Sequence, residues 1–152
     1  DPKLTNATGG NALLHFSDWI FEFQKRHKND QITSKNSKDG NPDGHWCKII
    51  FKKTPNETTG AEIRYPIRYG RTGGKSVWIE YEIFDSLVKW GFVEKAGSWV
   101  TVNQKLIDEL KENNLEIPEK IQGEDAFTAC LEENPELTKY LFTKLKETLT
   151  LV

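Results

Sequence analysis

The first half of the chain contains short apolar segments, some with alternating polar and apolar residues, separated by polar stretches, which is a pattern of strands. The segment SDWIFEFQ over residues 17–24 is rich in aromatic residues and predicts a largely buried strand. Two further strands are predicted over residues 47–52 and 62–69. Pro66 favours an edge position for the third strand, because proline cannot donate a hydrogen bond to the ladder. A long exposed loop over residues 25–44 separates the first two strands.

Helical spacing replaces this alternation in the second half. Apolar residues within residues 81–90 fall on one helical face, and Gly91 then ends the predicted helix. Residues 92–102 predict a hairpin, or a strand after a tight turn. Three more helices are predicted over residues 106–113, 123–132 and 135–149. Because the strands come first and the helices last, the sequence predicts a mixed α/β to α+β fold.

The composition indicates a soluble protein with one compact core, or with a main lobe and a small satellite. Of the 152 residues, 36% are hydrophobic and 29% are charged. No apolar run approaches the ~18–20 residues that a membrane span needs. Cys47 and Cys130 form no CxxC pair, which suits a reducing compartment. The chain contains no methionine and begins with Asp1, so we expect it to be a piece of a longer protein.

The formal net charge of −2 conceals a strong asymmetry. Residues 25–75 hold twelve Lys and Arg against five Asp and Glu, an excess of seven positive charges. Residues 100–152 hold six against eleven, an excess of five negative charges. All four arginines fall in the first stretch. A basic region of this kind is typical of a protein that binds a polyanion. A solvated surface with clustered charges is the alternative, and charge alone favours it slightly.

Two motifs suggest chemistry that their spacing does not support. The segment GRTGGKS over residues 70–76 resembles a phosphate-binding P-loop, but its first glycine would have to stand at Tyr69. We therefore interpret it as a flexible linker with exposed cations. His45, Cys47 and the acidic loop over residues 39–43 could suggest a metal, but they lack a second ligand pair at a recognised spacing. No metal site and no catalytic residue are predicted.

Five tryptophans are many for this length: Trp19, Trp46, Trp78, Trp90 and Trp99. Aromatic side chains can stack on the bases of single-stranded nucleic acid. Most of these tryptophans stand beside aliphatic residues in predicted elements, which favours packing in a core or at a subunit interface.

Three motifs, in order, resemble the bacterial RecA recombinase family and its phage relatives of the UvsX type. The first is TGGNAL over residues 8–13, followed by an aromatic residue and a strand. The second is EIRYPIRYG over residues 62–70, followed by a helix and the run GFVEKAGSW. The third extends from IQG at residue 121 to LEENPE at residue 136. The resemblance implies the C-terminal part of a RecA-like core over residues 1–75 and a small α/β C-terminal domain over residues 76–152.

The resemblance implies an ATP-dependent strand-exchange protein, active in homologous recombination and DNA repair. Its partners would be single-stranded and double-stranded DNA and further copies of itself in a filament, in the cytoplasm of a bacterium or of a phage-infected bacterial cell. ATP and Mg²⁺ would be cofactors of the intact protein, with none bound to this part. The chain has no Walker A lysine and no acidic metal partner, so we expect no ATPase activity from it alone. The alternative is a free-standing winged-helix-like DNA-binding or regulatory module, built from the helix over residues 81–90 and the hairpin after it.

The resemblance also implies roles for individual residues. DNA contacts are implied for Gly9, Gly10, Asn11, Lys25, Arg26, Lys48 and Lys95. ATP contacts at a subunit interface are implied for Lys52, Lys53 and Tyr69. The chain departs from the family at Phe51, where a lysine is expected, and at Glu124, where a basic residue is expected.

Overall fold

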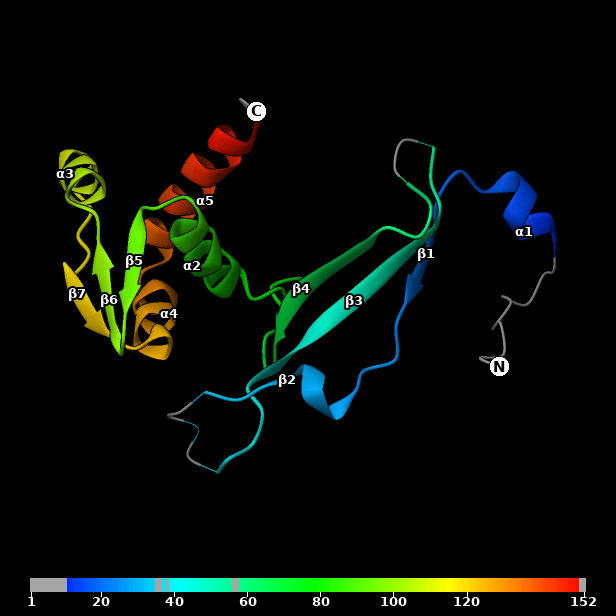
Figure 1. Ribbon diagram of the computed structural model, residues 1–152, viewed down its shortest axis with the longest axis horizontal. Helices are drawn as coiled ribbons and strands as arrows, with labels where there is room; N and C mark the ends of the chain where they lie inside the picture. Colours follow the sequence, from blue (N-terminus) through cyan, green and yellow to red (C-terminus); the bar gives the residue numbers. More distant parts are fainter. Residues whose placement is uncertain (1–10, 35–36, 38, 56–57, 151–152) are drawn as a thin grey trace.

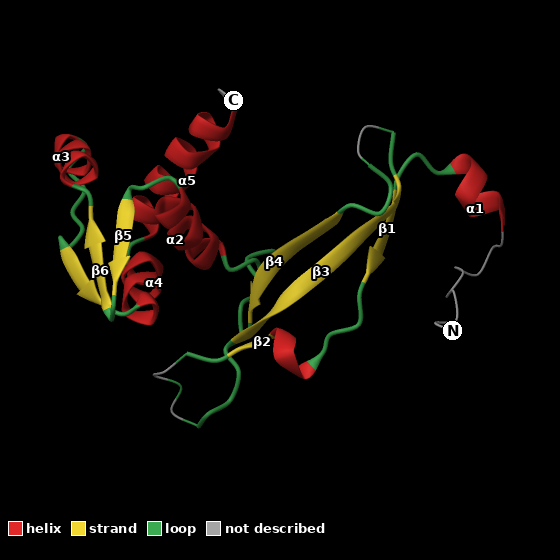
Figure 2. Cartoon of the chain, viewed as in Figure 1, coloured by secondary structure: helices red, strands yellow, loops and turns green. Residues whose placement is uncertain are grey.

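The computed structural model describes residues 11–34, 37, 39–55 and 58–150, which form two lobes built on antiparallel sheets (Figure 1). The N-terminal lobe holds the first sheet, and the C-terminal lobe holds the second sheet and the longer helices (Figure 2). The predicted mixed α/β to α+β class is therefore confirmed. Whether residues 1–75 and 76–152 fold as separate domains stays a prediction.

The N-terminal sheet is organised around one long central strand, β3. The elements of this lobe are α1 (Asn11–Phe16), β1 (Ile20–Phe23), η1 (Lys28–Asp30), β2 (Gln31–Ile32), β3 (Gly44–Lys53) and β4 (Glu62–Arg68). Strand β3 pairs with β4 along one edge and with β1 and β2 along the other. Pro66 lies on β4 opposite Trp46, and β4 is an edge strand, as its proline predicts. The helix α1 was not predicted.

The C-terminal lobe packs its helices against a three-stranded sheet centred on β6. Its elements are α2 (Ile79–Lys89), β5 (Val93–Ala96), β6 (Trp99–Val102), α3 (Gln104–Glu112), β7 (Lys120–Gln122), α4 (Glu124–Glu133) and α5 (Pro135–Thr150). The predicted hairpin is confirmed as β5 and β6, and the four predicted helices are confirmed with small shifts at their ends. Gly91 adopts φ 73°, a left-handed conformation that glycine adopts easily and that ends α2.

The hydrophobic core lies almost entirely in the C-terminal lobe. Its fully buried side chains include Leu87, Leu110, Phe127, Leu131 and Leu141, which come from α2, α3, α4 and α5. In the described strands of the N-terminal lobe, the buried apolar side chains are Ile49 and Pro66. The buried apolar side chains of the described residues are thus concentrated in the C-terminal lobe, and the described N-terminal sheet buries few.

One face of the N-terminal sheet is apolar and exposed. This aromatic face comprises Trp19, Phe21, Phe23, Phe51 and Ile63, with the rings of Phe21 and Phe51 centred 5.2 Å apart. Phe21 is 49% exposed and Phe23 is 64% exposed. The prediction of a largely buried first strand is therefore wrong for this chain, because no described helix covers this face. An exposed apolar patch of this kind is typical of a surface that another element or protein covers.

A carboxylate at the junction of the lobes collects three hydrogen-bond donors. The Oε1 atom of Glu132 on α4 lies 2.8 Å from Nε1 of Trp78, 3.1 Å from Nη2 of Arg71 and 3.5 Å from Nε of Arg68. Arg71 also donates to Glu80 over 2.9 Å. The prediction of exposed cations in the linker over residues 70–76 is therefore wrong for Arg71, whose side chain is only 24% exposed.

A second ionic group joins α3 to α5. Glu109 accepts hydrogen bonds from Nζ of Lys144 at 2.7 Å and from the hydroxyl of Tyr140 at 2.8 Å. The bond from Lys144 lowers the pKa of Glu109; burial opposes this shift, and the bond from Tyr140 reinforces it. The same bond to Glu109 raises the pKa of Tyr140 to about 12.

This group predicts acid sensitivity of the C-terminal lobe. Because the folded-state pKa of Glu109 lies below its ordinary value of 4.5, its stabilising contribution is present above that pH and is lost as the pH falls through the folded-state pKa. In the unmodified chain, the free energy of unfolding measured with urea should fall between about pH 5 and pH 3. In Glu109→Gln it should fall less, and the difference should be below about 1 kcal/mol because the pair is partly exposed. Glu116→Gln, at an exposed position after α3, is the control and should leave the acid dependence unchanged.

Candidate nucleic-acid interface

The face of the N-terminal sheet opposite the aromatic face is polar. This polar face comprises Glu22, Trp46, Lys48, Lys52, Glu62 and Arg64. Lys48 stands opposite Arg64 in the β3–β4 register, so the two cations lie side by side. Ion pairs join Lys48 to Glu62 at 2.7 Å and Lys52 to Glu22 at 3.0 Å, and all four side chains are between 37% and 40% exposed. Pairs this exposed can open for a competing anion at small cost.

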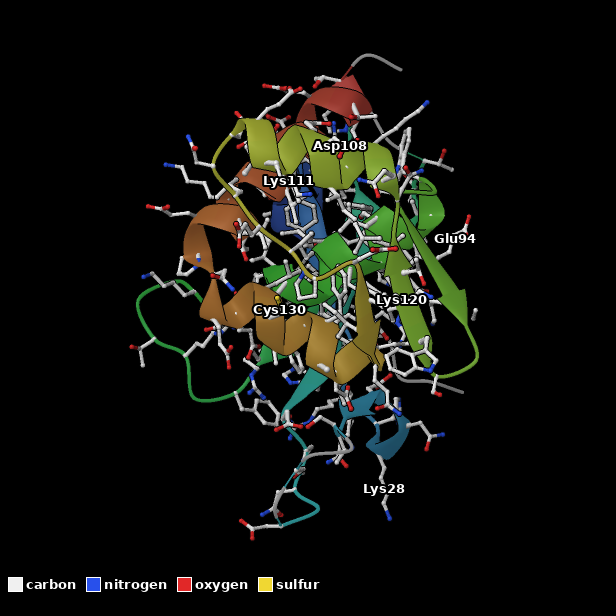
Figure 3. All side chains as sticks on the ribbon, turned by 90° about the vertical axis from the view of Figure 1, so that its left-hand side faces the viewer. Lys28, Glu94, Asp108, Lys111, Lys120 and Cys130 are labelled. Atoms are coloured by element: carbon white, nitrogen blue, oxygen red, sulfur yellow. The ribbon has the colours of Figure 1, made fainter. Side chains whose placement is uncertain are left out.

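Two of the predicted contact residues meet beyond the end of β4. Arg26 donates from Nη1 to the hydroxyl of Tyr69 over 2.7 Å, and the ring of His45 lies 5.4 Å from that of Tyr69. Burial lowers the pKa of His45, and the positive charge of Arg26 lowers it further. Lys25 is exposed beside Arg26, and Lys28 on η1 extends away from the body of the molecule (Figure 3).

The predicted ATP contacts do not lie together. Tyr69 follows β4 and lies beside the start of β3, where its amide donates to the carbonyl of Asp43, whereas Lys52 and Lys53 lie at the other end of β3. At about 3.3 Å per residue, the ten-residue strand separates them by about 30 Å. Within one chain, these lysines and Tyr69 cannot contact the same nucleotide.

The basic excess of the first half is partly neutralised in the fold, by carboxylates from outside residues 25–75 such as Glu22, Glu80 and Glu132. Arg64 pairs with Asp30 at 3.3 Å and Arg68 with Asp43 at 3.1 Å, while Arg71 pairs with Glu80. Counting charges along the sequence therefore overstates the positive potential of this lobe. The exposed lysines are the groups that remain suited to phosphate contacts.

Lys95 on β5 lies at a small pocket of the C-terminal lobe. The pocket has a volume of about 270 Å³ and is lined by the hairpin turn and by the start of α4. Glu124, in the first turn of α4, forms an ion pair with Lys95. Trp99 stands at the rim and is 47% exposed. A carboxylate of the same chain thus neutralises Lys95, for which the resemblance implies a DNA contact.

A groove that sequence reasoning missed lies between the polar face and α2. It has a volume of about 390 Å³, and Trp46, Arg64, Tyr81 and Lys89 are among the residues that line it. Burial raises the pKa of Tyr81, so its hydroxyl stays protonated and can donate. Side chains alternate between the two faces of a strand, so the sequence could have placed Trp46 on the same face of β3 as Lys48. Nothing in the sequence pattern indicated that α2 would pack beside them.

The glycine-rich motif lies mostly outside the described part of the chain. Gly9 and Gly10 are outside the described residues, and Asn11 is the first residue of α1.

The exposed fractions of the tryptophan side chains correct the interpretation of these residues as packed in a core. Trp19, Trp90 and Trp99 are each more than 40% exposed, so core packing within this chain is wrong for these three.

Comparison with known proteins finds similarity to bacterial RecA. The chain is 25% identical over 145 residues to the protein RecA of Pseudomonas savastanoi pv. phaseolicola (strain 1448A / Race 6) and, to the same extent, to that of Pseudomonas syringae pv. syringae (strain B728a). Each alignment covers 93% of this chain and 33% of the relative, so the chain spans about a third of the length of the curated relatives it matches. No protein-family model matches the chain. Among the described helices, none is long and apolar enough to cross a membrane.

Proposed function

We propose that this RecA-like chain is the C-terminal part of an ATP-dependent strand-exchange protein, and that it supplies DNA and subunit contacts. The similarity to RecA along 93% of the chain carries this proposal. The intact protein would form a filament on single-stranded DNA and pair it with a homologous duplex, using ATP and Mg²⁺. A phage source is part of the proposal and rests on the UvsX-like pattern of the sequence alone.

The distribution of buried residues supports a larger parent fold. The aromatic face leaves Phe21 49% and Phe23 64% exposed, while the main hydrophobic core lies in the other lobe. Apolar sheet faces are stable when another layer covers them. The two thirds of the relatives that lie outside the similarity provide enough chain for such a layer.

The candidate contacts divide naturally between different ligands. Lys25, Arg26 and Lys48 would hold a DNA strand on the N-terminal lobe, together with the segment from Gly9 to Asn11. Lys95 would hold duplex DNA on the C-terminal lobe. The distance of about 30 Å along β3 is compatible with Tyr69 at one nucleotide and Lys52 and Lys53 at another, as in sites shared between subunits.

A salt and sequence series tests this proposal. Fluorescence anisotropy should show similar affinities for single strands of several sequences and a steep fall in affinity with added salt, because the contacts are to phosphates. Lys48→Gln should reduce the logarithmic salt slope for single strands by about 0.7, the value of one phosphate contact. Lys111→Gln, on α3 of the C-terminal lobe, removes the same charge and should leave the slope unchanged.

The winged-helix-like alternative predicts a different outcome. It requires sequence-specific binding to a duplex through the major groove. The structure does not favour it, because α2 buries Ile83, Phe84 and Leu87 and carries Glu82 and Asp85 on its groove side, where carboxylates repel phosphate. A strong preference for one duplex sequence, or no binding to any strand at low salt, would contradict the proposal.

A further inference from the structure

The groove between the polar face and α2 is lined by two aromatic rings and a guanidinium group. Trp46 and Tyr81 meet edge to face, with centroids 5.6 Å apart and an interplanar angle of 86°. The guanidinium carbon of Arg64 lies 5.4 Å from the centroid of the Trp46 ring. The groove volume of about 390 Å³ is ample for one base and its sugar. Planar guanidinium and indole groups are both surfaces on which bases stack.

The aromatic walls of the groove are packed against neighbouring residues. Tyr81 packs against Trp78, with ring centroids 5.5 Å apart, and Trp78 is buried and donates to Glu132. Trp46 stands on the central strand of its sheet, opposite Pro66. A rigid stacking surface binds a base without a large cost of side-chain ordering.

The charges of the lining residues favour a base over a phosphate inside the groove. Arg64 and Lys89 line it together with Glu82 and Asp85, and Lys89 pairs with Asp85 at 2.6 Å. Two cations balance two carboxylates, so the groove does not concentrate phosphate. Lys48 stands on the open polar face directly opposite Arg64, so a phosphate beside the groove would meet that lysine.

We infer that this groove stacks one nucleobase of a single-stranded polynucleotide against Trp46 and Arg64, with the neighbouring phosphate on Lys48. This inference rests on the proposed function; the feature of the DNA that this part of the polar face recognises is the flat face of a base. Stacking is indifferent to sequence because every base has a flat face, so the site is compatible with strand exchange on any sequence.

A pair of probes separates bases from phosphates. The chain is titrated with a thymidine oligonucleotide and with an abasic strand of the same length, which keeps the phosphates and removes the bases. The unmodified chain should bind the thymidine strand about tenfold tighter than the abasic strand and should show quenched tryptophan emission. Trp46→Leu should abolish this difference and leave abasic binding unchanged. Trp90→Leu, which removes an exposed tryptophan after α2, is the matched control and should retain the difference.

Two further variants keep the result independent of folding defects. Arg64→Lys preserves the positive charge but removes the planar guanidinium group. It should reduce the difference in affinity between the thymidine and abasic strands and leave abasic binding unchanged. Lys48→Gln should weaken both strands equally. Thymidine monophosphate tests whether the groove binds a free nucleotide instead of a polynucleotide. If the chain binds this nucleotide as tightly as it binds the thymidine oligonucleotide, the proposal of a polynucleotide site is overturned.

The outcomes distinguish this inference from the proposed function. Equal affinity of the unmodified chain for the thymidine and abasic strands would overturn base stacking and leave phosphate binding intact. A difference that survives Trp46→Leu would also overturn it. Failure of the chain to bind either strand would overturn both proposals.

Discussion

Glu124→Gln is expected to tighten binding of the chain to duplex DNA about eightfold at about 0.1 M salt, because it frees Lys95 for one more phosphate contact. In the structure, Glu124 forms an ion pair with that lysine and neutralises it. Each phosphate contact to a duplex adds about 0.9 to the logarithmic salt slope, which gives the eightfold figure at that salt concentration. Anisotropy titrations at several salt concentrations measure both the affinity and the slope.

The position of Glu124 explains why a carboxylate is stable there. It lies in the first turn of α4, where the helix dipole stabilises negative charge, and Asp125 follows it in the same turn. The substitution should therefore cost the lobe only about 0.3–1 kcal/mol. A gain of affinity cannot arise from partial unfolding, so the sign of the change is informative by itself.

Glu94→Gln is the matched control for this prediction. Glu94 precedes Lys95 on β5, and its side chain points away from α4 on the outer side of the sheet (Figure 3). Glu94→Gln also removes one negative charge, from the strand that carries Lys95, but does not release Lys95. The double variant Lys95→Gln with Glu124→Gln should lose the gain. An equal gain from Glu94→Gln would show a general charge effect instead of a released lysine.

Local pattern was sufficient to predict most elements of this fold. The hairpin of β5 and β6 and the helices around it follow from periodicity and from stop signals such as Gly91, which act over a few residues. Strand β7 was missed because three residues are too few to show alternation, and its pairing with β6 is a tertiary contact. The exposure of β1 was missed because an aromatic alternating segment is normally buried, and the sequence does not show whether a covering layer is present.

The candidate site was less predictable, because its key contacts join residues that are distant in the chain. Period-two alternation places Trp46 and Lys48 on one face, but not the pairing of Lys48 with Arg64 on the next strand. Likewise, no local signal connects Lys95 with Glu124. A count of charges in a window assumes that cations are free, whereas tertiary contacts decide which of them are neutralised.

Glu132→Gln is expected to loosen the junction between the lobes, with a cost of about 2 kcal/mol in local stability. Three donors from Arg68, Arg71 and Trp78 converge on one oxygen of this carboxylate. Glutamine keeps an acceptor but removes the negative charge, so the two guanidinium groups lose their shared counter-ion. The side chain of Glu132 is 24% exposed, so the cost should be less than the 3–5 kcal/mol or so typical of a fully buried pair.

Trypsin offers a direct measurement, because Arg71 is itself a cleavage site and is held by this carboxylate. When opening is fast relative to cleavage, the cleavage rate follows the population of the open form. A cost of about 2 kcal/mol then corresponds to about 30-fold faster cleavage after Arg71, since about 1.36 kcal/mol is tenfold. Cleavage after Lys75, which is already exposed in the same linker, provides an internal reference and should change much less.

Glu133→Gln is the appropriate control, because Glu133 follows Glu132 on α4 but is exposed. It should leave both cleavage rates unchanged. An unaltered rate after Arg71 in Glu132→Gln would mean that the pair with Glu80 alone holds this arginine, and that Glu132 does not fix the junction. If the rate rises as expected, the same variant should also weaken the base-dependent part of single-strand binding, because Trp78 supports Tyr81 beside the groove and donates to Glu132.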